Sequence, residues 1–414
     1  MLKKILALIS SFILCVTALC ACGESDSSGG QGGSSEVQES SSEPEKLPET
    51  DEEWDKAMCE KALVSYGNTS LIKEKIEKAK NGEDITIGYL GGSITYGYKV
   101  NPDQCYAYLT HSYFAEKFGS KDNVGYCNAG LSGTPSKLGI LRMQRDLLES
   151  EPDIVFVEFA VNDGTDFSYQ EAYESIIRTL LEKGIAPVLL FSVTKDDYSA
   201  QDYMKELGEY YDLPMISYCD ALRFLFENNR LEWKDFSNDE AHPNPEGHKL
   251  VAKLIDNYFD TVEDIACDEY KMPDEPKNLL ISYGAKMYES DALDADSLGS
   301  WQQGGTDVAS FTNGWKRDGQ EDNSPLEFTV TGKNVIVIYK EVAKNSGAAV
   351  VEYTDENGNT DSIMIDPNAA GGWGNPQTAT LVTSDDTHTY KISVSMLGGD
   401  EDKPFQLLGL GVTE

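Results

Sequence analysis

A serine at the end of a strongly apolar segment is the first residue of this chain with an arrangement suited to chemistry. Residues 84–97 begin with alternating and then continuous β-forming residues, a pattern typical of a buried strand. Gly91 and Gly92 end that strand, and the backbone freedom of glycine lets the hydroxyl of Ser93 project from the turn. Ligands of an open parallel sheet bind just beyond the carboxyl ends of its strands, which is where a nucleophile is needed. A Gly-Gly-Ser turn by itself is more often only a turn, so Ser93 needs a base.

The chain has four histidines from which that base could come. His242 lies in an irregular stretch before a predicted helix, on a loop that can reach the carboxyl edge of a sheet. Asp239 precedes it by three residues and can accept a hydrogen bond from its Nδ1–H, which would fix the tautomer and stabilise the imidazolium. An isolated Asp-x-x-His is more often a surface turn. His248, near the start of the helix, is interpreted as structural; His111 lies in a predicted helix and His388 in a β-rich region.

Two further loops supply neutral hydrogen-bond donors. Residues 128–134, Asn-Ala-Gly-Leu-Ser-Gly-Thr, follow the second predicted strand, and Asn162 and Asp163 follow the third. A glycine N–H and an asparagine amide are the donors that an oxyanion hole uses. Taken separately, the first loop is only a turn and the second only the approach to a helix.

These motifs occur in this order, each after the expected element, and together they resemble the SGNH (GDSL-type) hydrolase family over nearly all of residues 84–257. The resemblance implies that Ser93 is the nucleophile and that its own N–H also donates to the oxyanion. It implies that Gly133 and Asn162 are the other oxyanion donors. Asp239 and His242 match the acid and base of the triad. The expected reaction is ester hydrolysis through an acyl-enzyme, without a metal or an organic cofactor.

Two positions depart from the family pattern. Gly92 stands where many members have Asp, which loosens any inference from the commonest lipases and esterases. Glu158 stands where the family often has a small or polar residue. Two interpretations of Glu158 remain open: a buried carboxylate paired with a neighbour, or a residue that shapes the acyl pocket.

These residues need a scaffold, and the alternation of helical and strand patterns from residue 52 to 265 predicts one. Five strands with intervening helices imply right-handed crossovers and a parallel sheet covered on both faces. The fold class is therefore a three-layer α/β/α domain with a five-stranded parallel sheet, flavodoxin-like as in SGNH hydrolases. The expected strands after the one that precedes Ser93 are residues 124–128, 153–160, 186–193 and 213–217.

From about Asp268 the pattern changes to short alternating runs separated by turn signals, which predicts an antiparallel β-sandwich, an accessory domain, over residues 275–414. Few contacts are expected to cross the composition shift at residues 268–277. Trp301, Trp315 and Trp373 could stack on sugar rings, although aromatic residues of a sandwich more often belong to its packing. Asp291 and its acidic neighbours fit no calcium loop and are interpreted as a solvated linker.

The formal net charge of -37 argues against a nucleic-acid partner, since a phosphate backbone requires a basic surface.

Residues 1–22 are typical of a targeting segment, with Lys3 and Lys4 before an apolar run. Leu19-Cys20-Ala21-Cys22 resembles a bacterial lipoprotein signal, which implies that Cys22 is lipidated. Residues 23–51 then form a disordered tether, and the protein is anchored at the extracellular face of the cell membrane; simple secretion is the alternative. Five cysteines follow the signal, and whether they form disulfides is left open.

These features favour a cell-surface serine esterase that removes O-acetyl groups from a polysaccharide. A lipid or short-chain ester hydrolase and a wall O-acyltransferase are the enzymatic alternatives. A non-catalytic glycan-binding lipoprotein is the third hypothesis, and the intact set of five motif residues counts against it.

Overall fold

The computed structural model describes residues 47–414, and residues 48–414 form one compact unit. The predicted signal segment, Cys22 and most of the predicted tether lie outside the described residues. Within residues 47–414 no helix combines the length and the apolar character that crossing a membrane requires.

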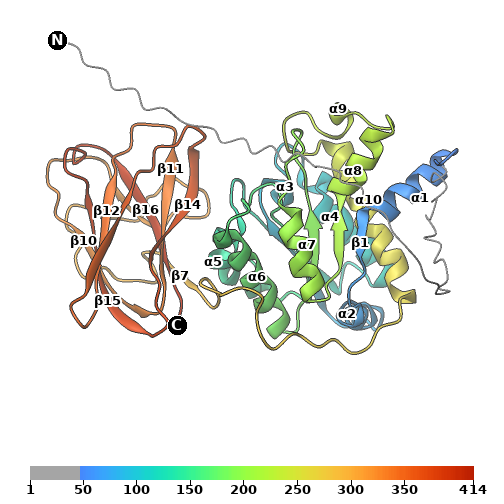
Figure 1. Cartoon of the computed structure of the whole chain (residues 1–414), viewed down its shortest axis with the longest axis horizontal. Helices are drawn as coiled ribbons and strands as arrows, with labels where there is room; N and C mark the ends of the chain where they lie inside the picture. Colours follow the sequence, from blue (N-terminus) through green and yellow to red (C-terminus); the bar gives the residue numbers. More distant parts are fainter. Residues whose placement is uncertain (1–46) are drawn as a thin grey trace, which may run out of the picture. The chain divides into compact units, whose positions relative to one another are not determined.

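A six-stranded sheet forms the centre of the α/β region, residues 51–264 (Figure 1). Its order is β1-β6-β5-β4-β2-β3, in which β2 to β6 run parallel and the short β1 pairs antiparallel with β6. The five parallel strands and their flavodoxin-like order are as predicted, and the antiparallel edge strand β1 is an addition to the predicted sheet. The chain order reverses between β2 and β4, which makes the carboxyl edge of these two strands the expected ligand site. The strands are β1 Leu63–Ser65, β2 Ile85–Gly91, β3 Val124–Gly130, β4 Ile154–Glu158, β5 Ala186–Phe191 and β6 Met215–Ser217.

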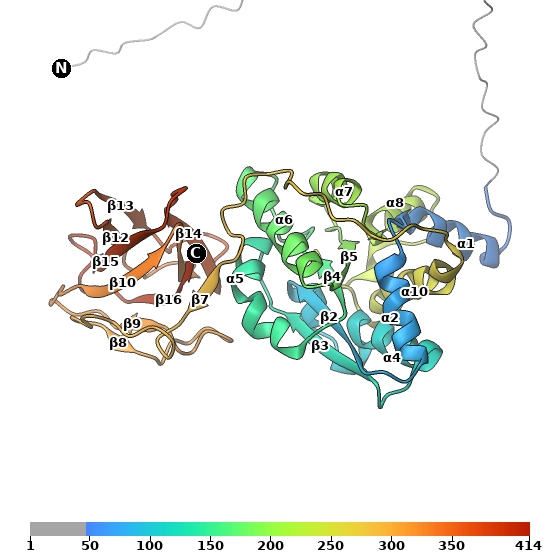
Figure 2. The same cartoon turned by 90° about the horizontal axis from the view of Figure 1, so that it is seen from below.

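Helices cover both faces of this sheet (Figure 2). Successive side chains of a strand point to opposite faces, so Tyr89 lies in one apolar core and Leu90 in the other. The core with Tyr89 is closed by α1 Asp51–Ala62, α2 Ser70–Lys80, α4 Tyr106–Phe118, α8 Tyr218–Glu227 and α10 Pro245–Thr261. The core with Leu90 is closed by α5 Ser136–Asp146, α6 Phe167–Glu182 and α7 Gln201–Tyr210. The short helices are α3 Ser93–Tyr96, α9 Trp233–Phe236, η1 Pro102–Gln104, η2 Leu148–Ser150 and η3 Val262–Asp264.

The β region, residues 286–412, consists of two antiparallel sheets. One has the order β10-β15-β12-β13, and the other has the order β14-β11-β16-β9-β8 with β7 also paired to β16. In β10 every second residue from Leu326 is buried, which is the alternation that the sequence shows. The three strands that sequence patterns missed are only two or three residues long: β7 Lys286–Tyr288, β8 Gln302–Gln303 and β9 Trp315–Arg317. The others are β10 Leu326–Gly332, β11 Val335–Val342, β12 Ala349–Thr354, β13 Thr360–Ile365, β14 Trp373–Val382, β15 His388–Met396 and β16 Phe405–Val412.

The segment between the two regions is held closely, so the expectation of few contacts at residues 268–277 is wrong. Glu174 of α6 is fully buried and accepts hydrogen bonds from the backbone N–H groups of Lys277 and Asn278. Glu171, one turn earlier, accepts from the N–H groups of Ile281 and Ser282 at 3.0 Å each. In sequence these glutamates look like solvated charges. They are buried because an extended segment with free N–H groups needs acceptors.

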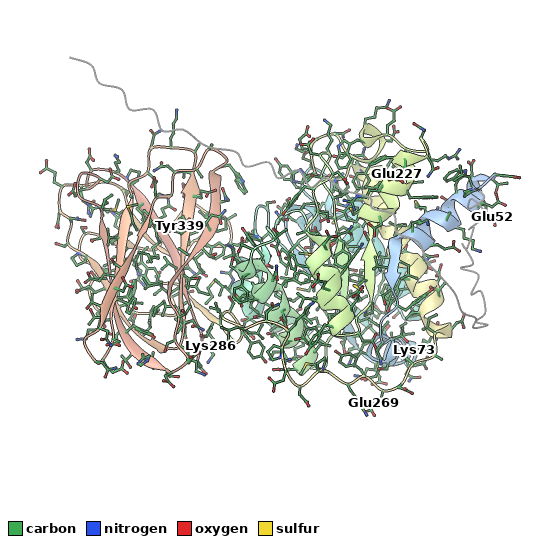
Figure 3. The ribbon with its side chains drawn as sticks, viewed as in Figure 1. Glu52, Lys73, Glu227, Glu269, Lys286 and Tyr339 are labelled. Atoms are coloured by element: carbon green, nitrogen blue, oxygen red, sulfur yellow. The ribbon has the colours of Figure 1, made fainter. Side chains whose placement is uncertain are left out.

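The two regions also share an apolar core. Side chains of β11 and β16 join those of α5, α6 and α7 in one cluster, and a Cβ on Gly411 would lie 2.8 Å from the Leu141 side chain. Arg145 of α5 adds an ion pair with Glu289 at 2.6 Å and lies over the ring of Phe311. Side chains fill both regions, with Tyr339 on β11 and Lys286 on β7 as landmarks (Figure 3). The helical layer of α5 and α6 is therefore packed on both of its sides.

Candidate active site

The serine turn lies at the carboxyl end of β2. Gly92 ends the strand, and Ser93 begins α3, a helix of four residues. The Ser93 hydroxyl lies 2.9 Å from Nε2 of His242, which comes from the loop before α10. The Ser93 side chain is mostly buried, with 9% of the residue exposed. The structure therefore brings together the serine and histidine that lie 149 positions apart in the sequence.

Asp239 holds the other side of the His242 ring. Its Oδ2 lies 2.9 Å from Nδ1, and its Oδ1 accepts from the backbone N–H of His242 at 2.8 Å. Burial alone would raise the pKa of Asp239, but hydrogen bonds from Lys99 and from the N–H groups of Ala241 and His242 hold this pKa well below its usual range. The ring of Tyr98 packs against the His242 ring, with centroids 4.8 Å apart. An ionised Asp239 fixes the proton on Nδ1 and leaves Nε2 free to accept from Ser93.

Asn162 lies directly against the serine turn. A Cβ on Gly92 would be 2.2 Å from Oδ1 of Asn162, so no side chain fits at position 92 while Asn162 keeps its place. Oδ1 of Asn162 is buried and has no hydrogen-bond partner.

Gly133 lies in the loop after β3, which runs beside β2 with Gly130 opposite Gly91. Its φ of +71° is in the left-handed region, which favours glycine. A Cβ on Gly133 would lie 2.6 Å from the ring of Trp373, which belongs to β14 of the β region. Trp373 is 64% exposed, whereas Trp301 and Trp315 are buried core residues. One exposed aromatic ring of the β region thus borders the loop of the expected oxyanion donor.

Comparison with known proteins shows which family and which solved structures this chain resembles. Residues 89–250 match the model of the GDSL-like lipase/acylhydrolase family. The structure of a two-domain esterase (CEX) active on acetylated mannans, co-crystallised with mannopentaose, superposes with a TM-score of 0.75 at 25% identity, covering 86% of this chain and 98% of that chain. A second structure of this esterase gives the same TM-score and coverage at 26% identity. The α/β region is therefore an SGNH-like domain that matches this family's model over residues 89–250.

A curated relative is the thioesterase 1/protease 1/lysophospholipase L1 of Escherichia coli (strain K12). It is 25% identical over 177 residues, which are 40% of this chain and 79% of that protein. The predicted fold of an SGNH-like α/β domain followed by an antiparallel β region is confirmed. The two-domain match supports a hydrolase of the esterase type.

Within the SGNH-like domain, two buried charged residues hold the site loops, and only one of them, Asp163, lies in a sequence motif. Arg142 of α5 donates to the backbone carbonyls of Ala129 (2.6 Å) and Gly91 (2.9 Å), and to the hydroxyl of Thr134. It therefore ties the end of β2 to the loop that carries Gly133. An arginine four positions before the end of an amphipathic helix resembles a surface residue in sequence, so no local signal identifies it.

Asp163, the residue after Asn162, is structural. Its Oδ1 accepts from the backbone N–H of Ser136 at the start of α5 (2.7 Å), and its Oδ2 accepts from the hydroxyl of Tyr203 (2.8 Å). Burial raises the pKa of Asp163 to about 7, against the lowering effect of these hydrogen bonds. Asp163 thus connects the Asn162 loop with the helix that follows the Gly133 loop.

The other histidines serve the fold. Nδ1 of the buried His248 accepts from the backbone N–H of Tyr106 at 3.2 Å, and burial lowers its pKa to about 4. His111 bonds the carbonyl of Val124, and His388 pairs with Glu356 in the β region. The five cysteines of the described residues are free. Residues 47–414 contain no group of three or more His, Cys, Asp or Glu side chains that could hold a metal ion.

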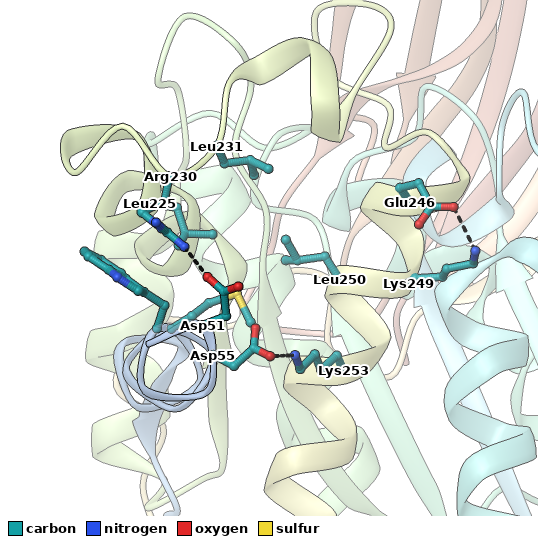
Figure 4. A pocket seen from close by; sticks show the side chains of 11 residues that line it. Asp51, Asp55, Leu225, Arg230, Leu231, Glu246, Lys249, Leu250 and Lys253 are labelled. Carbon is teal, nitrogen blue, oxygen red and sulfur yellow. Dashed lines mark hydrogen bonds and ion pairs between the residues drawn. The ribbon is translucent and has the colours of Figure 1, made fainter. Parts of the chain in front are cut away.

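A pocket of about 390 Å³ lies elsewhere, between α1, α8 and α10, and none of its lining residues belongs to the site (Figure 4). Its charges pair with one another: Arg230 with Asp51, Lys253 with Asp55, and Lys249 with Glu246, at 2.6–2.8 Å. The pocket therefore presents no unpaired charge to a ligand.

Proposed function

We propose that this chain is a serine esterase that removes O-acetyl groups from a polysaccharide. The contact of Ser93 Oγ with His242 Nε2, with Asp239 on the far nitrogen of the ring, carries the proposal. This contact lies at the carboxyl edge of the parallel sheet, where the strand order reverses between β2 and β4.

In the proposed reaction Ser93 Oγ attacks the acetyl carbonyl carbon while His242 Nε2 takes the hydroxyl proton. The carbonyl oxygen becomes an oxyanion, which accepts hydrogen bonds from the N–H groups of Ser93 and Gly133 and from the Asn162 amide. The intermediate collapses, the bond to the sugar oxygen breaks, and His242 returns the proton to that oxygen. Water then attacks the acetyl-enzyme by the same route and releases acetate.

Aromatic residues near the site support a carbohydrate substrate. Trp373 from the β region and Tyr98 from the loop after α3 are 64% and 42% exposed, and they lie against Gly133 and His242 respectively. Flat exposed rings bind the apolar faces of sugars through burial of surface. The similar two-domain esterase is active on acetylated mannans, which makes acetylated mannan the first polymer to test.

A second candidate function is the hydrolysis of a lipid ester or a thioester. It is favoured by the similarity to the Escherichia coli protein named thioesterase 1/protease 1/lysophospholipase L1. The two candidates differ in acyl length and in leaving group. The decisive measurement compares acetate release from acetylated mannan and xylan with fatty-acid release from a lysophospholipid. Faster turnover of the lipid would replace the polysaccharide proposal.

The test of the chemistry is Ser93→Ala. We expect hydrolysis of a soluble acetyl ester to fall by at least about 10³-fold, without a change in melting temperature, because the nucleophile is lost. An organophosphonate should label Ser93 in the wild type and nothing in the variant. His388→Gln, a histidine change outside the site, is the matched control and should retain full activity. Glycan binding without any acetate release would favour the non-catalytic lipoprotein.

We also propose that the enzyme is attached to the extracellular face of the cell membrane through a lipidated Cys22, with residues 23–51 as a tether. The sequence Leu19-Cys20-Ala21-Cys22 supports this proposal. The native protein should enter the detergent phase on partition, and Cys22→Ser should remain in the aqueous phase or uncleaved. Equal partition of the two proteins would contradict the anchor.

A further inference from the structure

A carboxylate with no cation lies beneath the serine turn. Glu158 is the last residue of β4, fully buried, and it pairs in register with Gly91 at the end of β2. It therefore lies at the point where the order of the strands reverses. Among the described residues no lysine, arginine or histidine forms an ion pair with it. Burying such a carboxylate costs several kcal/mol unless hydrogen bonds compensate, so its presence requires an explanation other than packing.

The hydrogen bonds of Glu158 lead to the serine turn. Oε2 accepts from the Thr95 hydroxyl at 3.0 Å, and Oε1 accepts from the Ser192 hydroxyl at 2.5 Å. Burial raises the pKa of Glu158, and hydrogen bonds from these hydroxyls and from the backbone N–H groups of Gly92 and Thr95 lower it in part. Gly92 is the N-cap of helix α3, and Thr95 is its third residue.

Helix α3 needs the Glu158 carboxylate as a hydrogen-bond acceptor, because it has no N-cap side chain of its own. It has four residues, too few to be stable alone, and its N-cap is Gly92, which has no side chain to accept from the third N–H. A side chain at position 92 would collide with Asn162. The carboxylate of Glu158 instead accepts from the hydroxyl of Thr95, the third residue of the helix, at 3.0 Å from the neighbouring strand, and so holds the first turn as an N-cap side chain would.

We propose that Glu158 is a positioning residue that caps α3 from β4 and thereby holds Ser93 in line with His242 while leaving room for Asn162. Thr95 links α3 to its surroundings, because its hydroxyl also bonds Tyr106 at 2.9 Å and its carbonyl accepts from Asn128 at 2.7 Å. This inference rests on the proposed role of Ser93 as the nucleophile. Of the two interpretations of Glu158, these hydrogen bonds favour the buried carboxylate paired with its neighbours.

The test uses the full chain with Glu158→Gln, which keeps the shape and removes the charge. We expect kcat on a soluble acetyl ester to fall by about 10- to 100-fold while KM stays within about twofold, because the nucleophile is misplaced and the binding surface is intact. The rate of phosphonate labelling at Ser93 should fall in parallel. A folded Glu158→Gln with wild-type kcat and labelling would overturn the proposal.

Glu174→Gln is the matched control, since Glu174 is also a fully buried carboxylate without a cation but lies on α6. It should lower the melting temperature and leave kcat within about twofold. If Glu158→Gln does not fold, Thr95→Val decides, because it removes one bond of the cap: about a tenfold loss of kcat at constant KM supports the proposal, and no loss overturns it. If wild-type Ser93 is not labelled at all, the proposed function fails instead, and that outcome is distinct.

Discussion

The SGNH-like α/β domain and the β region both bury charged side chains, but only the former gathers them around the candidate active site. In the SGNH domain, Arg142, Glu158 and Asp163 all bond loops at the carboxyl edge of the sheet. In the β region the buried Arg317 bonds Ser300, Gln320 and Glu401, which joins loops without a nucleophile or a base.

Strand direction explains the difference. Parallel strands place all their carboxyl ends at one edge, so loops from distant parts of the chain converge there. Antiparallel strands alternate, and consecutive loops alternate between opposite ends of the sandwich. The β region therefore contributes single side chains such as Trp373, while the SGNH-like domain supplies every reacting group that we propose.

The largest effect should follow from deleting the β region. A chain that ends near Asp268 would expose the apolar faces of α5, α6 and α7 and leave the buried Glu171 and Glu174 without their donors. We expect loss of soluble folded protein, or a fall in melting temperature of more than about 10 °C, with parallel loss of activity on a small ester and on polymer. A stable truncated chain that is fully active on the small ester would show that the two regions are independent.

Asn162→Ala tests the chemistry that is assigned to the SGNH domain alone. Loss of one oxyanion donor should lower kcat by about 10²–10³-fold, or roughly 3 kcal/mol of transition-state stabilisation, on every substrate. Thermal unfolding would show whether the variant is folded. Asn359→Ala, in the turn between β12 and β13, is the matched control and should not change kcat. An unaffected rate in folded Asn162→Ala would remove this residue from the oxyanion site.

Trp373→Ala tests what the β region adds. Loss of an exposed ring next to the Gly133 loop should reduce kcat/KM on acetylated mannan by about tenfold and leave a soluble acetyl ester within about twofold. Met364 is 62% exposed on the other sheet of the β region, and Met364→Ala is the matched control. Equal losses on both substrates would mean that Trp373 supports the loop and does not bind sugar.

The smallest effect should come from Lys99→Met. Lys99 bonds Asp239 Oδ2 at 2.7 Å and helps to lower its pKa, but the N–H groups of Ala241 and His242 remain. Because the pKa of Asp239 is lower in the folded state, its stabilising effect is present above the unfolded pKa of about 3.9 and is lost as the pH falls through the folded pKa. The difference in melting temperature should be about 1–3 °C at neutral pH and shrink toward pH 2, with kcat at pH 7 within about threefold. A difference that grows on acidification would contradict this assignment.

Local sequence was sufficient for the elements that carry the motifs. The strands of continuous apolar residues are followed by glycines or by the loop that carries Asn162. Such strands can be predicted because side-chain periodicity and turn chemistry are local properties. The local patterns predict the parallel strands. The family resemblance then predicts their order and the juxtaposition of Ser93 with His242. The very short strands β7, β8 and β9 were not, because two or three residues hold no period.

What the sequence determined by itself is the kind of residue at each strand end and the helix or strand that precedes it. Only the tertiary structure decided how the charges are used: Glu158 beneath the serine turn, Arg142 across two strand ends, and Glu171 and Glu174 on the connecting segment. In sequence each of them is an ordinary charged residue. A carboxylate or guanidinium acquires such a role only from the backbone groups that surround it, and those groups come from segments far away in the chain.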